Sequence, residues 1–238
     1  MKRVILFFVM MMVVVSASAA EVEVINAGVG GNSTRNLLKR VEVDVLAKKP
    51  AVVVMMVGTN DALNSGNSVP IKEYEKNLKQ LVKRFTKSGS KVVLMTIPPC
   101  INDLLFSRHK AEFFAERSPD DRIADVNAVV KKLAQPDGVR LVDVHALLEK
   151  GGAGSEKSSL LRNVANSRSK DGVHPTSEGY DVIAQGVFEV LKAAKWDTGT
   201  IVCFGDSITY GASMKGAGTA GADADTYPAK LARLLKGL

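Results

Sequence analysis

Residues 51–57 (AVVVMMV) are apolar without interruption. A strand with one face in solvent alternates apolar and polar side chains, whereas a parallel strand covered by helices on both faces is apolar throughout. Shorter apolar runs fit further strands at 22–27, 91–97, 139–144 and 201–204, and segments with helical periodicity lie between them. The alternation predicts an α/β protein, a three-layer α/β/α sandwich on a five-stranded parallel sheet.

The predicted helices begin at residues that favour helix N-termini, which stand at 32–33, 70, 118–119 and 176. Two regions have weaker patterns. Residues 100–117 are expected to form a loop with a short helix, and residues 151–170, rich in Gly, Ser, Lys and Arg, a long mobile polar loop. Because no internal repeat appears, residues 21–238 are predicted to form a single domain.

Residues 1–20 have the outline of a secretory signal peptide. Lys2 and Arg3 precede the twelve-residue apolar run from Val4 to Val15, and the small residues at 16–20 suit cleavage. The run is shorter than the ~20 apolar residues that span a membrane comfortably. An uncleaved anchor is the less favoured alternative. We therefore expect a secreted or periplasmic protein with no stable membrane insertion after cleavage.

The charge and the cysteines exclude little but set two expectations. The formal net charge is +7, and it falls to +5 when Lys2 and Arg3 leave with the signal peptide. The other basic residues are scattered along predicted helices and few aromatic residues can stack on bases, so no nucleic-acid partner is expected. Cys100 and Cys203 are expected to be separate thiols, with Cys203 in the core, because a disulfide demands a particular geometry.

Polar clusters that contain glycine follow three of the predicted strands, at residues 28–33, 58–61 and 205–207. Ligands of open α/β sheets bind outside the carboxyl ends of the strands. The three clusters should therefore converge on one edge of the sheet. Asp171 and His174, on the loop before the last long helix, can reach the same edge.

The chemistry that this set suggests is acyl transfer by a serine. Ser207 needs a base within hydrogen-bond reach, and His174 is the best candidate among the three histidines. In a D-x-x-H spacing, Asp171 can accept from one ring nitrogen while the other nitrogen faces the serine. The Gly31 N–H, the Ser207 N–H and the Asn60 side-chain amide are candidate donors to the developing oxyanion.

The remaining polar residues are interpreted as structural. Asp61 and Asp206 are expected to brace loops, and His109 is expected to be solvated on a polar helix. Asp143 and His145 alternate at the end of a predicted strand, which favours a structural role there. Asp171 and His174 have no third and fourth ligand at a convincing spacing, so neither a metal nor a cofactor is expected.

These clusters resemble the four sequence blocks of the SGNH, or GDSL, hydrolases: Gly205-Asp206-Ser207, the turn ending at Gly31, Gly58-x-Asn60-Asp61 and Asp171-x-x-His174. The resemblance spans nearly all of residues 21–238 and implies the flavodoxin-like fold of that family. It also implies a triad of Ser207, His174 and Asp171 and an oxyanion hole of Ser207, Gly31 and Asn60. Matching residues 25–27 (INA) to the second block favours Gly31 as the oxyanion glycine, with Gly28 as the fallback.

The order of the blocks departs from the family, in which the serine block comes first. Here it comes last, and each block occurs once, which favours a circular permutation with its break between residues 237 and 22. The alternative is a hydrolase without its first block, followed by the truncated start of a second copy. Permutation predicts that the strand at 201–204 inserts between those at 22–27 and 52–57, with 91–97 and 139–144 beyond.

By resemblance, the expected activity is that of a secreted serine esterase. Residues 207–211 (SITYG) and 226–228 (TYP) are most similar to the carbohydrate acetylesterases of the family. The expected partner is therefore an acetyl ester, either a small molecule or a polysaccharide. A lysophospholipase or broad arylesterase is the alternative within the family. An exported glycan-binding module without turnover is the alternative from another class.

Overall fold

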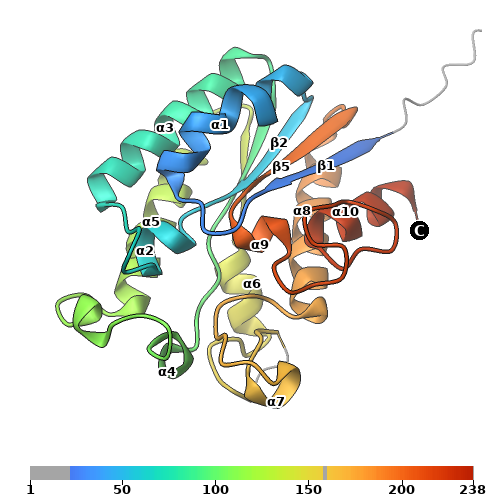
Figure 1. Ribbon diagram of the computed structural model, residues 1–238. Helices are drawn as coiled ribbons and strands as arrows, with labels where there is room; N and C mark the ends of the chain where they lie inside the picture. The colour runs from blue at the N-terminus through green and yellow to red at the C-terminus, as the bar shows by residue number, and fades with distance from the viewer. Residues whose placement is uncertain (1–21, 158–159, 238) are drawn as a thin grey trace, which may run out of the picture.

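The computed structural model describes residues 22–157 and 160–237, and the predicted signal peptide at 1–20 lies outside the described residues. Five strands form one sheet between layers of helices (Figure 1). The strands are β1 (Glu23–Gly28), β2 (Val52–Met56), β3 (Lys91–Met95), β4 (Val139–Val142) and β5 (Thr200–Gly205). The α-helices are α1 (Thr34–Asp44), α2 (Thr59–Leu63), α3 (Ile71–Lys87), α4 (Asn102–Leu105), α5 (Pro119–Leu133), α6 (Val144–Lys150), α7 (Val164–Ser167), α8 (Ser177–Ala194), α9 (Ser207–Tyr210) and α10 (Tyr227–Lys236), with single 3₁₀ turns at Leu46–Lys48 and Ala111–Phe114.

The strand order is β1-β5-β2-β3-β4, and all neighbouring strands are parallel. The last strand of the chain therefore lies inside the sheet. Val202 of β5 pairs with Ile25 of β1, and Cys203 pairs with Val54 of β2. This order confirms the predicted insertion of β5. It contradicts the alternative in which residues 201–238 begin a second copy, because β5 completes the sheet of its own chain.

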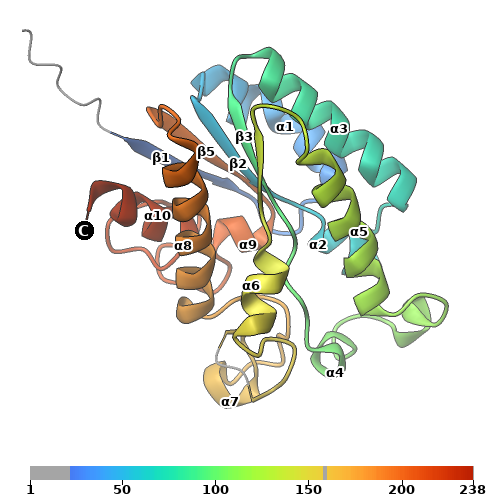
Figure 2. The same cartoon turned by 180° about the vertical axis from the view of Figure 1, so that it is seen from behind.

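Helices cover both faces of the sheet, which explains why its central strands carry no alternating pattern. α1, α3 and α5 lie side by side on one face, and α8 and α10 pack together on the other (Figures 1 and 2). β2 is buried along its whole length, as its uninterrupted apolar sequence predicts. On α3, the apolar stripe at helical spacing faces the sheet, and Phe85 meets Phe204 of β5 edge-on with 6.2 Å between ring centroids.

Arg40 of α1 joins the first strand to the last. Its guanidinium donates to the carbonyl oxygens of Ala27 at 2.9 Å and Gly205 at 2.7 Å, and it lies over the Phe204 ring at 4.4 Å. At the opposite end of these strands, Val22 and Lys236 line the same small pocket. The two ends of the described chain are therefore neighbours in space.

Two predicted regions are structured differently from expectation. The fourth strand ends at Val142, and residues 144–150 form α6 with Asp143 as its N-cap, which accepts from the Ala146 N–H. The placement of Asp143 and His145 at a strand end was therefore wrong, because a capping aspartate starts a helix there. Within the predicted polar loop, residues 164–167 form α7. Leu160 and Leu161 of this loop are buried, so its second half packs as part of the protein.

The two thiols are free and Cys203 is fully enclosed in the core, as predicted, and Cys100 is buried as well. Among the helices of residues 22–157 and 160–237, none combines the length and the apolar character needed to cross a membrane.

Candidate active site

The polar clusters meet beyond the carboxyl ends of the strands, where the short helices α2, α4, α7 and α9 gather (Figure 1). β5 ends in Gly205, and a Cβ at this position would lie 2.3 Å from the Met56 carbonyl oxygen of β2. Glycine is therefore required for the close approach of the two strands. Asp206 then caps α9 by accepting from the Ile208 N–H at 2.9 Å. This turn places Ser207 at the first position of a helix that points into the cleft.

The structure brings Ser207, His174 and Asp171 into one chain of hydrogen bonds. The Ser207 Oγ lies 2.9 Å from His174 Nε2, and His174 Nδ1 lies 2.9 Å from both carboxylate oxygens of Asp171. A carboxylate beside Nδ1 fixes the proton on that nitrogen. Nε2 is then free to accept the Ser207 proton, which is the arrangement that activates a serine nucleophile.

Asp171 is held as an anion in a fixed orientation. Its Oδ1 accepts from the backbone N–H groups of Val173 and His174, each at 3.0 Å. Burial alone would raise the pKa of Asp171, but the hydrogen bond from His174 and the charges of His174 and Arg108 lower this pKa to about 2. The carboxylate therefore stays ionised over the range in which a histidine works as a base.

The loop that carries Asp171 and His174 is clamped by residues 160–163. The Arg162 N–H donates to the His174 carbonyl at 2.9 Å, and the Gly172 N–H donates to the Arg162 carbonyl at 2.8 Å. An antiparallel bridge between Leu161 and Pro175 completes the clamp. The side chain of Arg162 adds a charge, with its Nε 3.7 Å from Asp171 Oδ2. The supposed mobile loop thus supports the triad segment.

A pocket of about 350 Å³ opens onto Ser207 and His174, and Gly31 and Asn60 also line it. The Asn60 side-chain amide donates one hydrogen to the Asn32 carbonyl at 3.0 Å and its oxygen accepts from Asn64 at 3.3 Å. Because an amide nitrogen has two hydrogens, a second donor remains for a ligand. In the described part of the chain, the backbone N–H groups of Gly31 and Ser207 also have no protein acceptor. The three residues predicted to supply oxyanion donors therefore line one pocket.

The two glycines proposed for the oxyanion position differ in their surroundings. Gly31 lines the pocket, has a φ of 74° and has open space where a Cβ would stand. Gly28 is buried against α9, where a Cβ would lie 2.1 Å from the Tyr210 nitrogen. Gly28 thus serves close packing of β1 on α9, and the geometry favours Gly31 as the donor.

Asp61 and Asp206 are fully buried and brace the site, as expected. Asp61 accepts from the backbone N–H of Thr34 at 3.0 Å, at the start of α1, and from the Thr34 hydroxyl. The second oxygen of Asp206 has no hydrogen-bond partner within the described residues. Burial raises the pKa of each carboxyl to about 6.

Asp206 should make the stability of the protein fall as pH rises. Its pKa in the folded state exceeds that of an unfolded aspartate, so between about pH 4 and 6 the folded state binds more protons, and stability is lost as pH rises through 6. Asp206→Asn should remove this loss, a gain of about 2–3 kcal/mol at pH 8 and none near pH 4. Urea unfolding across this range measures it.

The raised pKa of Asp61 also makes the stability of the protein fall as pH rises. Part of the pH dependence of stability should therefore remain in Asp206→Asn. The exposed Asp137→Asn is the matched control and should reproduce the wild-type curve. If the free energy of unfolding changed with pH equally in wild type and Asp206→Asn, Asp206 would not have a raised pKa in the folded protein.

No sequence pattern predicted that the following residues line the pocket: Leu63, Asn64, Leu105, Arg108 and His109. His109 was expected to be solvated, but it is half-buried in the pocket wall, with Nδ1 3.4 Å from the Ser65 hydroxyl. The prediction was wrong because the α4 segment folds back over the sheet edge. Only its packing brings these residues to Ser207.

His145 lies outside this pocket, on α6, where its Nε2 is 3.3 Å from Glu149. Asp143 accepts from the Thr96 hydroxyl at 2.9 Å as well as capping α6. Both residues therefore have the structural contacts that were expected of them. Within residues 22–157 and 160–237, no group of three His, Cys, Asp or Glu side chains is arranged to hold a metal ion.

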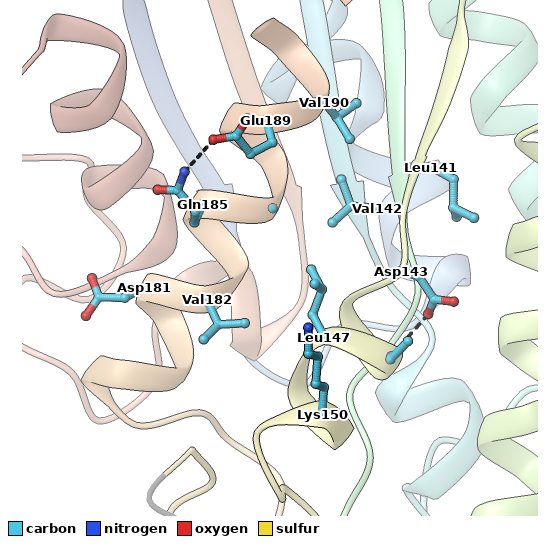
Figure 3. Close-up of a pocket in the computed structure, with 12 residues that line it drawn as sticks. Leu141, Val142, Asp143, Leu147, Lys150, Asp181, Val182, Gln185, Glu189 and Val190 are labelled. Atoms are coloured by element: carbon cyan, nitrogen blue, oxygen red, sulfur yellow. Dashed lines mark hydrogen bonds between the residues drawn. The ribbon is translucent and has the colours of Figure 1, made fainter. Parts of the chain in front are cut away.

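A larger cavity, of about 830 Å³, lies between α6 and α8 and does not include the triad. Leu147 of α6 and Val182 of α8 stand on its two sides (Figure 3). Its polar groups, such as Gln185 and Glu189, bond to each other at 2.7 Å. Its lining is otherwise mainly aliphatic and includes no serine, threonine, cysteine or histidine, so it does not offer the acyl-transfer chemistry of the Ser207 pocket.

Comparison with known proteins defines the class that this fold and site represent. The model of the GDSL-like lipase/acylhydrolase family matches residues 13–182, so the chain belongs to that family. The match includes Gly31, Asn60, Asp171 and His174 and ends before Ser207. The family resemblance is thereby confirmed, and the protein is a carboxylic ester hydrolase.

Three similar proteins represent the relatives. The chain is 30% identical to an acetylxylan esterase of Geobacillus stearothermophilus, over 69% of this chain and 69% of that protein. It is 27% identical to the lipoprotein YqeF of Bacillus subtilis, over 72% and 74% of the two chains. The crystal structure of the acetyl xylan esterase AlAXEase superposes with a TM-score of 0.54 at 26% identity, covering 69% of this chain and 79% of that one.

Proposed function

We propose that this protein is an exported serine esterase that removes acetyl groups from carbohydrate. The observation that carries the proposal is the hydrogen-bonded chain Asp171–His174–Ser207 at a pocket that Gly31 and Asn60 also line. Two of the similar proteins are named as acetylxylan esterases, which supports an acetylated glycan as the substrate class. The predicted signal peptide supports export.

In this mechanism, Ser207 Oγ attacks the ester carbonyl while His174 Nε2 takes the serine proton. Asp171 holds the imidazole in the required tautomer and stabilises its positive charge. The N–H groups of Gly31 and Ser207 and the Asn60 amide stabilise the oxyanion. His174 then protonates the departing sugar oxygen, and water hydrolyses the acetyl-enzyme by the same steps in reverse roles. The chemistry requires no cofactor.

The pocket is compact and offers polar partners to the alcohol part of a substrate. Its volume of about 350 Å³ is at the low end for ligand sites, and Thr59, Asn60, Asn64 and Arg108 supply hydrogen-bonding groups on a wall whose surface is otherwise mainly apolar. A short acetyl group with a polar alcohol fits better than a lysophospholipid.

Acetyl release tests the proposal directly. The purified protein should release acetate from acetylated xylan, and it should hydrolyse 4-nitrophenyl acetate at least about tenfold faster than the octanoate ester, judged by kcat/KM. Ser207→Ala sets the background, and Ser155→Ala, an exposed serine far from the pocket, is the matched control. A preference for chains of eight carbons or more would favour the lysophospholipase alternative. Equal, slow rates for wild type and Ser207→Ala would favour the glycan-binding module.

A further inference from the structure

Arg108 is the one residue with a permanent charge that lines the pocket of Ser207 in the described chain, and no carboxylate lines this pocket. The arginine follows α4, and its side chain is 37% exposed. Asp61 and Asp206 are buried beneath the site and do not reach the pocket surface. A charged side chain in a cleft of this size has to be satisfied by solvent, by the protein or by a ligand.

The contacts of Arg108 leave most of its guanidinium available. Nη2 donates to the Asp171 carbonyl oxygen at 2.9 Å, and its distance of 3.6 Å from Asp171 Oδ1 is too long for a hydrogen bond. No other hydrogen bond of this guanidinium occurs within residues 22–157 and 160–237. A guanidinium has five N–H donors, so an edge that could hold a carboxylate remains open.

Asp171 has several partners besides Arg108. Its carboxylate already accepts from the His174 ring and from two backbone N–H groups, and Arg162 adds a second cation at 3.7 Å. The side chain of Arg162 is less exposed than that of Arg108, at 18% against 37%. The two arginines therefore divide their roles: Arg162 lies behind the triad carboxylate, and Arg108 faces the pocket.

The position of Arg108 relative to the triad is fixed by main-chain bonds. The Arg108 N–H donates to Leu105, which is buried, and the Ile101 N–H at the start of α4 donates to the Gly172 carbonyl at 2.8 Å. The neighbouring His109 adds no lasting charge, since burial and then the charge of Arg108 lower its pKa below the ordinary value. A substrate held by Arg108 would lie in the pocket that Ser207 also lines.

We propose that Arg108 is a specificity residue that binds a carboxylate of the substrate, so that the enzyme prefers acetyl esters on acidic sugars. A uronic acid residue carries the required carboxylate close to its acetylated hydroxyls, and a planar carboxylate matches the arginine fork. This inference rests on the proposed esterase function and extends it from acetylated glycans to acidic ones.

A matched pair of substrates tests the inference: monoacetylated methyl glucuronoside and the corresponding glucuronamide, which lacks the charge. Wild type should hydrolyse the acid with a kcat/KM about tenfold above that of the amide at low salt, mostly through KM. The preference should shrink in 0.5 M NaCl. Arg108→Gln should reduce this preference to about twofold or less, and Arg108→Lys should keep part of it.

Arg84→Gln is the matched control, because Arg84 lies on α3 and pairs with Glu42 at 3.5 Å. This variant should keep the wild-type preference. Equal rates for acid and amide in wild type would overturn the inference, and so would a preference that survives in Arg108→Gln. Failure of wild type to hydrolyse either ester would instead contradict the proposed function.

An inhibition measurement on wild type tests the inference even if Arg108→Gln disturbs the triad. The unacetylated methyl glucuronoside should inhibit hydrolysis of 4-nitrophenyl acetate by wild type with a Ki about tenfold below that of the glucuronamide, and salt should abolish the difference. Equal Ki values for acid and amide would overturn the inference without any variant.

Discussion

Ser207→Ala should lower kcat for acetyl esters by about 10⁴-fold or more, the largest effect expected of any single substitution. In the described chain, the only hydrogen bond of the Ser207 Oγ goes to His174, at 2.9 Å. Removing this oxygen removes the nucleophile and leaves the cap of α9 on Asp206 intact. The free energy of unfolding should therefore change by less than about 1.5 kcal/mol. Initial rates on 4-nitrophenyl acetate and urea unfolding measure the two quantities.

The double variant Ser207→Ala/His174→Ala distinguishes a triad from a serine that merely contributes to binding. Residues that act as one unit have strongly non-additive effects on kcat. The double variant should hence be no slower than Ser207→Ala alone. The assigned roles of Ser207 and His174 would be refuted if the kcat losses of the two single variants multiplied in the double variant. They would also be refuted if Ser207→Ala kept more than about 1% of wild-type kcat.

Removal of residues 201–238 should abolish both folding and activity. β5 lies between β1 and β2 and pairs with each over five or more residues. Its side chains at Ile201, Val202, Cys203 and Phe204 are fully buried. A chain that ends at Thr200 would expose the facing surfaces of two strands and of Phe85. It should lack a cooperative unfolding transition in circular dichroism and lack esterase activity.

A rearranged chain supplies the matched control for this deletion. Residues 201–237 would be placed first and joined by a short Gly/Ser linker to residues 22–200. Val22 and Lys236 line the same pocket, so a short linker can bridge the two ends. The rearranged protein should fold and retain kcat/KM within about threefold of the original order, since every strand keeps its neighbours. An unfolded product would show that the present order of segments is itself required.

This control also bears on the history of the chain, for which we infer a circular permutation of the usual GDSL order. The family match at 13–182 lacks the serine block, and in the structure the strand that leads into this block, β5, lies between β1 and β2. Arg40 of α1 bonds to the carbonyl groups of both Ala27 and Gly205, so the segments at the two ends of the chain close around one side chain.

Local patterns in the sequence determined the elements and the core of the chemistry. Apolar runs defined the strands, because burial on both faces leaves no place for a polar side chain. The D-x-x-H spacing brought Asp171 and His174 together, since four residues in one tight turn have few conformations. Glycines after strands marked the turns at the sheet edge. Even the interior place of β5 followed from the family resemblance.

Tertiary structure alone decided what surrounds that chemistry. Arg108 and His109 reach the pocket because α4 folds over the sheet edge, and Arg162 reaches Asp171 because residues 160–163 pair with the triad loop. Residues 144–150 are helical with Asp143 as the cap of the helix, although Asp143 and His145 fit the alternation of a strand. Such placements depend on contacts between segments far apart in sequence, which no local period encodes. The sequence therefore determined the strands and the reacting groups, and packing decided which charges face the substrate.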